Sequence, residues 1–302
     1  MTIKKILVTG GTGLVGSALC QLLQQEGYEV ALLSRSKNAN SPYPIFTWDY
    51  QSNYIEEGAF EGIDAIVHLA GAGVADKRWS AERKKVLLES RTLTSALLYD
   101  TLKTVPNQVK TVIAASAIGL YGCTNAPQMM TEDSPKGTDF LANITDHWET
   151  NTGRIKELDI RLVQLRIGVV LSNKGGALVK LLEPPVAAKL GKGDQYMSWI
   201  HMDDVCGIFL WALQNEQAAG PYNVVAPGPL TNKDFTKKAA NIFKKPFVPF
   251  PVPRKLLYVI LGQMAEIVLG GSKISCKKIQ SEGYQFKFTD FESAVKDLKN
   301  QN

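Results

Sequence analysis

Three glycines occur where a buried strand is expected to meet a helix. In the segment VTGGTGLVG, Gly10, Gly13 and Gly16 follow the apolar run 3–8 and open a helical pattern over 13–26. Such a loop turns tightly, lets a pyrophosphate approach the backbone, and aims the helix N-terminus at the phosphates. The sequence therefore predicts a dinucleotide site here, with a purely structural turn as the alternative. The predicted cofactor contacts of this loop are Gly10, Thr12, Gly13, Leu14, Val15 and Gly16.

The second strand ends in the basic segment LLSRSK, about twenty residues after the loop. An Asp or Glu at this position would bind a free ribose 2′-hydroxyl, whereas Ser34, Arg35 and Lys37 offer hydrogen bonds to a 2′-phosphate. This favours NADP(H) over NAD(H), and a solvent-facing arginine is the alternative. Asp49, after the third strand, is a candidate for the adenine amino group or equally for a turn cap.

Apolar runs of strand length alternate with helical patterns through the first two-thirds of the chain. This alternation predicts an α/β fold, a Rossmann-type doubly wound parallel sheet with helices on both faces. We expect a cofactor domain over 1–171, with sheet-associated segments at about 200–226, and a smaller, mostly helical substrate-side domain over 172–302. The proline-rich segment 244–255 is interpreted as a connector. The expected strands are 3–8, 29–33, 45–48, 65–69, 109–116 and 160–171, and the expected helices are 13–26, 80–103 and one from about 139.

Charge is spread unevenly along this chain of 302 residues with net charge +5. From Lys233 onward there are 13 basic and 6 acidic residues, so the preceding part is slightly acidic. Solvated lysines on outer helix faces explain this best, and an acidic partner or anionic surface is the alternative. We expect a small-molecule partner, neither nucleic acid nor a membrane, and a monomer or homodimer.

Cysteines and apolar tracts narrow the expected compartment. The four cysteines lack CxxC spacing, so neither a metal site nor a disulfide framework is expected, and a reducing cytoplasm fits best. The N-terminus runs straight into a strand without a signal-peptide cleavage site. The most apolar tract, 256–271, is too short to cross a bilayer and is interpreted as a buried or groove-lining helix.

Ordered motifs give the chain a family resemblance. TGGTGLVG, HLAGAG, ASAIGLYG, LRIGVVLS and SWIHMDDV occur in that order. Together they resemble the extended short-chain dehydrogenase/reductase superfamily, which contains sugar-nucleotide epimerases and dehydratases. ADKRW at 75–79, Ser90-Arg91, GGAL and the C-terminal segment from GQMAEIVLGGSKI to FESAVKDL are similar to its atypical epimerase-like subfamily, which has its own small C-terminal domain.

The resemblance implies positions around the cofactor. Ser116 would end a strand beside the nicotinamide, with a serine satisfied by backbone as the alternative. Arg166 would follow the sixth strand at the cofactor, where the family begins to shape its substrate pocket. We expect the substrate between Ser116, the ADKRW loop and the segment GDQYMSWIH. The adenosine half of the cofactor would meet Leu69, Ala70 and Gly71.

The proton relay usual in the resembled superfamily is not where the register predicts it. Relatives place a tyrosine about 25 residues after the strand-end serine and a lysine four residues later, and the ammonium stabilises the phenolate. Counted from Ser116, these positions are Leu141 and Thr145. The YxxxK string from Tyr99 to Lys103 lies before Ser116, at the end of a helix, and is treated as a decoy.

Other side chains are weaker candidates for chemistry. Tyr121 is a candidate proton donor or, more often at such a turn, a packing residue. Candidate substrate anchors are Arg78, Arg91, His147 and His201. For His201 a structural role bound to backbone is the stronger interpretation, and Asp203 and Asp204 most simply cap the next helix.

Two functions are compatible with these residues. The first is an NADP(H)-dependent oxidoreductase or epimerase-like enzyme that acts on an unidentified small molecule with an unusual proton donor, Ser116 or Tyr121. The second is a catalytically weak or inert NADP(H)-binding regulatory or scaffold protein. The fold alone does not decide between them.

Overall fold

A parallel sheet of eight strands forms the centre of the computed structural model, which describes residues 3–125 and 127–301. All neighbouring strands in it run parallel except β3 and β4 at one edge, which are antiparallel. The predicted fold class is thereby confirmed. In spatial order the strands are β13 (Gly220–Val224), β8 (Arg161–Ile167), β6 (Thr111–Ala117), β5 (Ala65–His68), β1 (Lys5–Thr9), β2 (Glu29–Ser34), β3 (Ile45–Asp49) and β4 (Tyr54–Ile55).

The chain changes direction across the sheet next to β1. It first builds β2 and β3 on one side of β1 and then crosses to build β5, β6 and β8 on the other side. The loops that follow β1 and β5 therefore diverge at their carboxyl ends and leave a crevice between them. The glycine loop lies at this switch point.

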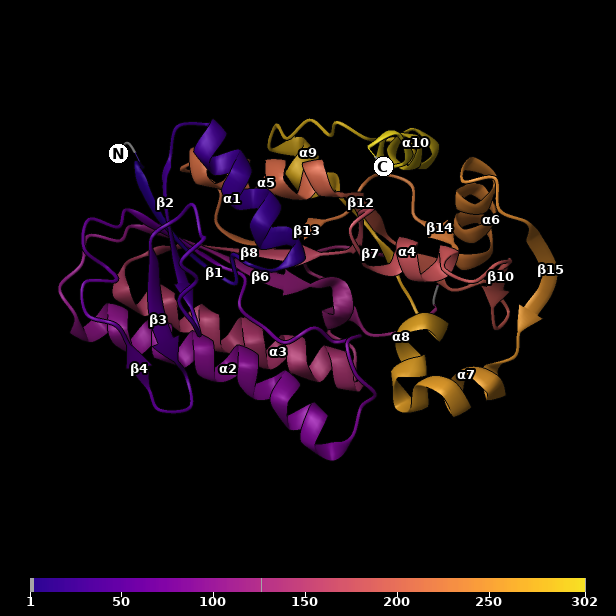
Figure 1. The fold of residues 1–302 in the computed structure, drawn as a ribbon, viewed down its shortest axis with the longest axis horizontal. Coiled ribbons are helices and arrows are strands. Elements are labelled where there is room, and N and C mark those ends of the chain that lie inside the picture. Colours follow the sequence, from indigo (N-terminus) through magenta and orange to yellow (C-terminus); the bar gives the residue numbers. More distant parts are fainter. Residues whose placement is uncertain (1–2, 126, 302) are drawn as a thin grey trace.

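Helices cover both faces of the sheet, as the near-continuous apolar strands require (Figure 1). On one face lie α2 (Ala81–Thr104) and α3 (Phe140–Gly153), together with the short helix η2 (Arg154–Leu158). On the other face lie α1 (Leu14–Gln25), α5 (Met202–Gln214) and the short α9 (Lys277–Ser281).

Side-chain caps fix where α2 and α3 begin. Ser80 accepts a hydrogen bond from the Arg83 backbone N–H at the start of α2. Asp139 accepts from the Ala142 N–H at 2.9 Å and, through its other oxygen, from the Cys123 N–H at 2.7 Å. Because Cys123 follows the short helix η1 (Ile118–Tyr121), this one carboxylate ties the start of α3 to the segment after β6.

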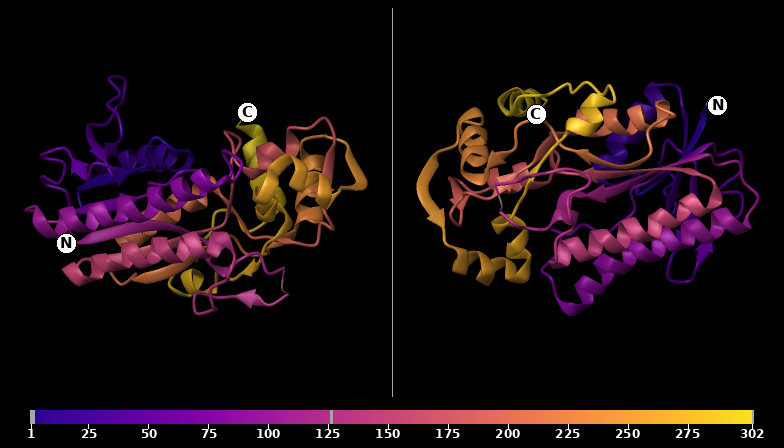
Figure 2. Two further views of the ribbon diagram at one scale, coloured as in Figure 1. Left: turned by 90° about the horizontal axis from the view of Figure 1, so that it is seen from below. Right: turned by 180° about the vertical axis from the view of Figure 1, so that it is seen from behind.

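A smaller group of elements packs at the carboxyl edge of the sheet around clusters of its own, one that contains Trp199 and Phe291 and a second that contains Leu257 and Leu269. Figure 2 shows this group to one side of the large sheet. Its strand pairs are β9 (Val169–Leu171) with β12 (Trp199–His201), β10 (Ala187–Leu190) with β15 (Phe247–Val252), β11 (Tyr196–Met197) with β14 (Leu230–Thr231), and β7 (Met129–Met130) with β16 (Lys273–Ile274). Its helices are α4 (Ala177–Leu182), α6 (Asn232–Ile242), α7 (Arg254–Leu261), η3 (Gly262–Met264), α8 (Ala265–Leu269) and α10 (Phe291–Asn300).

Three local expectations were wrong. The proline-rich segment was interpreted as a connector, but it forms β15, which pairs with β10 through a shifted register. An edge strand tolerates prolines because its outward-facing N–H groups need no partner in the sheet. The tract 256–271 is not one helix: Gly262 has φ +61°, which ends α7 and starts a new direction. The expected strand 160–171 is divided at Gly168 into β8 and β9.

The later part of the chain returns to the large sheet. β13 adds its outer strand beside β8, and α5 and α9 cover one of its faces. The division at residue 171 stays a prediction. In the described ranges, none of the helices is both long and apolar enough to cross a membrane.

Candidate cofactor site

The glycine loop is shaped by steric limits at two positions. Gly10 has φ +69°, and a Cβ there would lie 2.9 Å from the carbonyl carbon of Leu69. A Cβ on Gly16 would overlap the carbonyl oxygen of Gly10. The first glycine therefore allows the loop after β5 to approach, and the second allows α1 to pack tightly behind the loop.

A buried polar network holds the two loops of the crevice together. The hydroxyl of Thr9 accepts hydrogen bonds from the backbone N–H groups of Leu69 and Ala70, each at 3.1 Å. It therefore donates to Nδ1 of His68 at 2.8 Å, and Nε2 of His68 donates to Ser95 Oγ at 3.2 Å. Burial lowers the pKa of His68 to about 4, so the imidazole is neutral. Sequence reasoning missed Thr9, His68 and Ser95.

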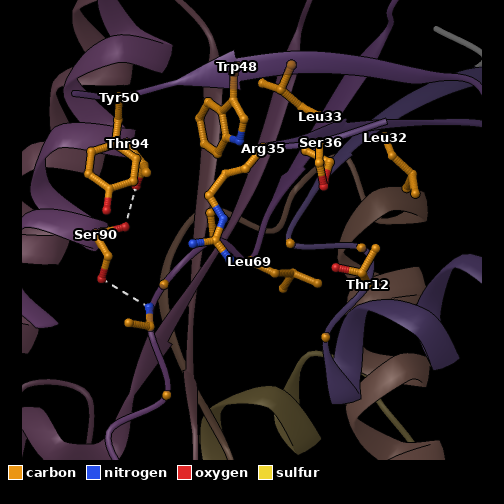
Figure 3. Close-up of a pocket in the computed structure, with 18 of the residues that line it drawn as sticks. Thr12, Leu32, Leu33, Arg35, Ser36, Trp48, Tyr50, Leu69, Ser90 and Thr94 are labelled. Carbon is orange, nitrogen blue, oxygen red and sulfur yellow. Dashed lines mark hydrogen bonds between the residues drawn. The ribbon is translucent and has the colours of Figure 1, made fainter. Parts of the chain in front are cut away.

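A cavity of about 600 Å³ opens in this crevice. Figure 3 shows it between Thr12 of the glycine loop, the residues after β2, and the Ser90–Thr94 stretch of α2. Of the predicted cofactor contacts, the cavity walls include Gly10, Thr12, Gly13, Ser34, Arg35, Leu69, Ala70 and Gly71. The structure thus brings together glycine-loop, β2-end and β5-end residues that lie far apart in sequence.

Arg35 lies in this cavity between Trp48 and Leu69 (Figure 3). Ser36 and Asn38 of the same turn also line the wall, together with Tyr50 after β3. Lys37, the other candidate for a 2′-phosphate, instead pairs with Glu56 at 2.7 Å. Asp49 accepts from the Gln51 N–H at 2.9 Å and the Ser52 hydroxyl at 2.8 Å, so it caps a turn.

The cavity is also lined by a second arginine, Arg83, which sequence reasoning did not single out. Arg83, in the first turn of α2, donates to the Gly73 carbonyl at 2.6 Å and lies 3.6 Å from the Asp76 carboxylate. Its Nε is buried and has no hydrogen-bond partner among the described residues. Arg83 thereby fastens the loop 71–79 over one side of the cavity. The Ser90 hydroxyl holds the same loop by accepting from the Ala72 N–H at 3.0 Å.

Ser116 and Arg166 meet at a residue that sequence reasoning missed. Ser116 is 3% exposed and donates to Oε1 of Glu149 at 2.5 Å. Arg166 donates to both carboxylate oxygens of Glu149. Although burial acts to lower it, the pKa of Arg166 is raised by the hydrogen bonds and charge of Glu149. The structure therefore turns Arg166 toward α3 rather than into the cavity beside the glycine loop.

Tyr121 is enclosed by the same network. Its side chain is 1% exposed, donates to Asn223 Oδ1 at 2.6 Å and accepts from Arg166 Nη1 at 2.8 Å. Burial raises its pKa, with Arg166 opposing that shift. This geometry fits the packing alternative, because both hydrogen-bonding positions of the phenol face protein groups.

The positions expected for the usual tyrosine and lysine lie against η1. A Cβ on Gly119 would be 3.5 Å from both Leu141 Cβ and Thr145 Oγ1. Thr145 donates to the Leu141 carbonyl at 2.8 Å, within α3. The YxxxK string lies elsewhere: Tyr99 donates to Glu157 at 2.8 Å and packs in the core beneath the sheet.

The remaining candidates are dispersed. Arg78 is an exposed residue of the loop 71–79, and its side chain lies against Gly262 at the start of η3. Arg91 is buried, donates to the Leu87 carbonyl and stacks 5.0 Å from the Trp148 ring, and burial lowers its pKa to about 10. His147 is exposed and bonds the Asn143 carbonyl of its own helix.

His201 is structural by its contacts. It is fully buried, and Nδ1 accepts the Asp203 N–H at 3.1 Å to cap α5. Nε2 therefore carries the hydrogen and faces Asp297 at 3.5 Å. Burial lowers the pKa of His201, against the raising influence of Asp203. The expectation that Asp203 and Asp204 cap this helix was wrong, because His201 is the cap of α5. Asp203 pairs with Lys287, and Asp204 accepts the backbone N–H groups of Lys287 and Phe288, so both hold a C-terminal segment.

A glycine loop at the switch point of a doubly wound parallel sheet, beside a cavity, defines a Rossmann-type dinucleotide-binding fold. A family model described as "NAD dependent epimerase/dehydratase family" matches residues 6–142, and one described as "Domain of unknown function (DUF1731)" matches 252–298. Together with the full-length relative described next, these matches show that the chain belongs to the epimerase family.

Similar proteins span the whole chain. An epimerase family protein of Staphylococcus aureus (strain MRSA252) is 34% identical over 98% of this chain and 99% of its own length. The crystal structure of the human epimerase family protein SDR39U1 (isoform 2) with NADPH superimposes with a TM-score of 0.89 at 30% identity, covering 99% of this chain and 100% of that chain. A nucleoside-diphosphate sugar epimerase from Corynebacterium glutamicum has a TM-score of 0.80 at 31% identity, covering 98% of this chain and 58% of that chain.

Proposed function

We propose that this chain binds NADP(H) in preference to NAD(H). The observation that carries the proposal is the end of β2, where Ser34, Arg35 and Ser36 line the cavity. The guanidinium of Arg35 supplies charge-assisted hydrogen bonds to a 2′-phosphate, whereas a carboxylate at this turn would repel it. The presence of NADPH in the structure of the similar human protein supports the same preference.

Titration of NADPH and NADH by nicotinamide fluorescence tests the preference. Arg35→Ala is expected to weaken NADPH binding by roughly 10- to 100-fold, the value of a hydrogen bond to a charged group, and to leave NADH binding nearly unchanged. Lys37→Ala is the matched control in the same turn, since Lys37 pairs with Glu56. Equal NADPH affinity of wild type and Arg35→Ala, or tighter binding of NADH by wild type, would overturn the proposal.

The second part of the proposal is an oxidoreductase or epimerase-like reaction on a small molecule. The bound nicotinamide would accept or supply hydride, while Leu141 and Thr145 cannot provide the usual proton relay. Ser116 is the proposed proton-exchanging residue, and Tyr121 is the second candidate for this role. The substrate would lie between Ser116, the loop 75–79 and the segment 193–201. Because one similar structure is that of a nucleoside-diphosphate sugar epimerase, nucleotide sugars are among the compounds to test.

A cofactor-binding protein without turnover is the second candidate, because Ser116 and Tyr121 are both buried and hydrogen-bonded to protein groups. Aldehydes, ketones and nucleotide sugars, followed at the nicotinamide absorbance, separate the two candidates. Turnover that Ser116→Ala or Tyr121→Phe abolishes, with NADPH binding intact, supports the enzyme. Tight NADPH binding without turnover of any compound in the panel supports the inert binder.

The proposed setting is a reducing cytoplasm, with the chain acting as a monomer or homodimer. Cys20, Cys123, Cys206 and Cys276 are free thiols. Burial raises the pKa of Cys20 to about 12, which keeps that thiol protonated and unreactive. These free thiols are compatible with a reducing compartment.

A further inference from the structure

An exposed apolar surface lies at the end of the molecule formed by β15 and α7. We call it the α7 face, and it consists of Leu256, Val259 and Ile260 of α7. Phe250 of β15 and the basic Arg254 and Lys255 at the start of α7 are exposed in the same stretch of the chain. In Figure 1, α7 and β15 lie at the periphery, away from the N-terminal strands. The face therefore lies at the opposite end of the molecule from the first strands of the sheet.

The exposure of these side chains is large. Phe250 is 77% exposed, Val259 71%, Ile260 55% and Leu256 46%. On α7 the three aliphatic side chains follow the i, i+3, i+4 spacing of one helix face, while Leu257 and Leu261 point to another side and pack inward. An ordinary surface helix would carry polar residues on its outward face, so an apolar outward face indicates a contact surface.

The charge around this face has one sign. Residues 244–262 contain Lys244, Lys245, Arg254 and Lys255 and no Asp or Glu. Lys245 is held by the carbonyls at the end of α4, whereas the exposed Arg254 and Lys255 form no ion pair with the described residues. Lys192 is also exposed in the turn after β10, as is the acidic Asp194.

We propose that the α7 face docks on the surface of an anionic lipid bilayer. The stretch from Phe250 to Ile260 combines exposed aliphatic and aromatic side chains with the exposed pair Arg254-Lys255, which matches the composition of segments that lie in the membrane interface. The apolar groups enter the boundary between headgroups and acyl chains, and the basic groups attract anionic headgroups. A second copy of this chain would instead bring the same basic groups into mutual repulsion.

The inner side of the same segment reaches the predicted substrate region. Met264 of η3 and Ile267 of α8 pack against a cluster that contains Trp79, and Phe140 and Leu141 also pack on it. Docking would therefore hold the proposed substrate side near the lipid surface. This proposal favours the alternative of an anionic surface, named above for the basic C-terminal part, over the expectation that a membrane is not a partner. It does not depend on the proposed reaction.

Vesicle flotation of the full chain tests the docking. The probes are vesicles of phosphatidylcholine alone and of phosphatidylcholine with phosphatidylglycerol, at low and high salt. Wild type is expected to float with the anionic vesicles only and to be released by salt. The double variant Val259→Ser, Ile260→Ser is expected to lose at least about tenfold in binding, because two aliphatic groups no longer enter the interface.

Matched controls isolate the face. Val105→Ser changes a valine that is 44% exposed at the end of α2, and Lys85→Gln removes an exposed charge on the same helix; both are expected to bind vesicles like wild type. Arg254→Gln with Lys255→Gln is expected to weaken binding to anionic vesicles only. Unchanged NADPH binding checks the fold of every variant. The proposal is overturned if wild type does not float with anionic vesicles or if the double variant floats equally well. It is also overturned if light scattering shows that wild type is a dimer and the double variant is a monomer.

Discussion

Glu149 of α3 and Arg166 of β8 form a bidentate ion pair inside the protein. Nε and Nη2 of the guanidinium donate to the two carboxylate oxygens at 2.8 and 2.9 Å, and the side chains are only 13% and 8% exposed. Ser116 of β6 donates to the same carboxylate. The pair therefore ties one helix and two neighbouring strands together beneath the carboxyl edge of the sheet.

Breaking this pair should cost far more stability than breaking a surface pair on the same helix. Glu149→Gln leaves the Arg166 charge buried without its counter-ion, and we expect a loss of about 3–5 kcal/mol in the free energy of unfolding. Asp146→Asn removes the exposed pair with Lys136 and should cost less than about 1 kcal/mol. Urea unfolding of both variants measures the difference. Similar losses for the two variants would contradict a dominant role for the buried pair.

Gly16→Ala should abolish tight cofactor binding. The added methyl overlaps the Gly10 carbonyl oxygen, so the glycine loop must move away from α1. We expect NADPH affinity to fall by at least about tenfold, a loss of 1.4 kcal/mol or more. Gly153→Ala, at the end of α3 where an added Cβ meets nothing within 4 Å, is the control and should leave NADPH binding unchanged. An unaltered NADPH dissociation constant for Gly16→Ala would show that the loop does not contact the cofactor.

Thr9→Val should loosen the loop after β5. The substitution keeps the shape of the side chain but removes the acceptor of the Ala70 N–H, whereas the Leu69 N–H keeps the Thr9 backbone carbonyl as a partner. A donor left without its partner in the interior costs about 1–3 kcal/mol, so both stability and NADPH affinity should fall. Thr9→Ser keeps the hydroxyl and should retain most of both. Equal behaviour of Thr9→Val and Thr9→Ser would show that the hydroxyl is dispensable.

His68 should make stability depend on pH between about 4 and 6.5. Burial lowers the pKa of His68 to about 4 in the folded protein, whereas an unfolded histidine titrates near 6.5. In this window the unfolded chain binds a proton that the folded chain does not, so stability falls as the pH falls, by on the order of 3 kcal/mol in total.

Chemical unfolding at several pH values measures this dependence. His68→Gln lacks the titrating group, so the difference in unfolding free energy between wild type and variant should narrow as the pH falls from 7 to 4. The carboxylates common to both proteins cancel in that difference. A difference that stays constant with pH would contradict a neutral buried imidazole.

The central sheet could be predicted because its signals are local. The strands at the centre of the sheet are apolar runs, and α2 and α3 begin at recognisable caps, Ser80 and Asp139. The glycine loop and Arg35 were found from their spacing along the chain. Arg35 reaches the cavity because β1 and β2 are neighbours and parallel, which that spacing already implies.

Residues that act through tertiary contacts could not be predicted in the same way. Glu149 falls eight positions after Leu141 on an amphipathic helix, and its burial depends on Arg166, which comes from a different strand. The fate of Arg166 was misjudged for the same reason, since a strand-end arginine can turn toward either face. The exposed stripe on α7 was also hidden, because an apolar tract by itself indicates burial.

The late return of the chain to the large sheet has a consequence for synthesis on the ribosome. β13 pairs with β8, and Ile279 of α9 joins the core on one face of the sheet. A nascent chain that ends near residue 171 therefore has a bare β8 edge, and the face later covered by α5 and α9 is still open. Such an edge is prone to pair with other strands. The complete sheet can therefore form only after residues beyond 280 have left the exit tunnel, and until then the edge of β8 and one face of the sheet stay exposed.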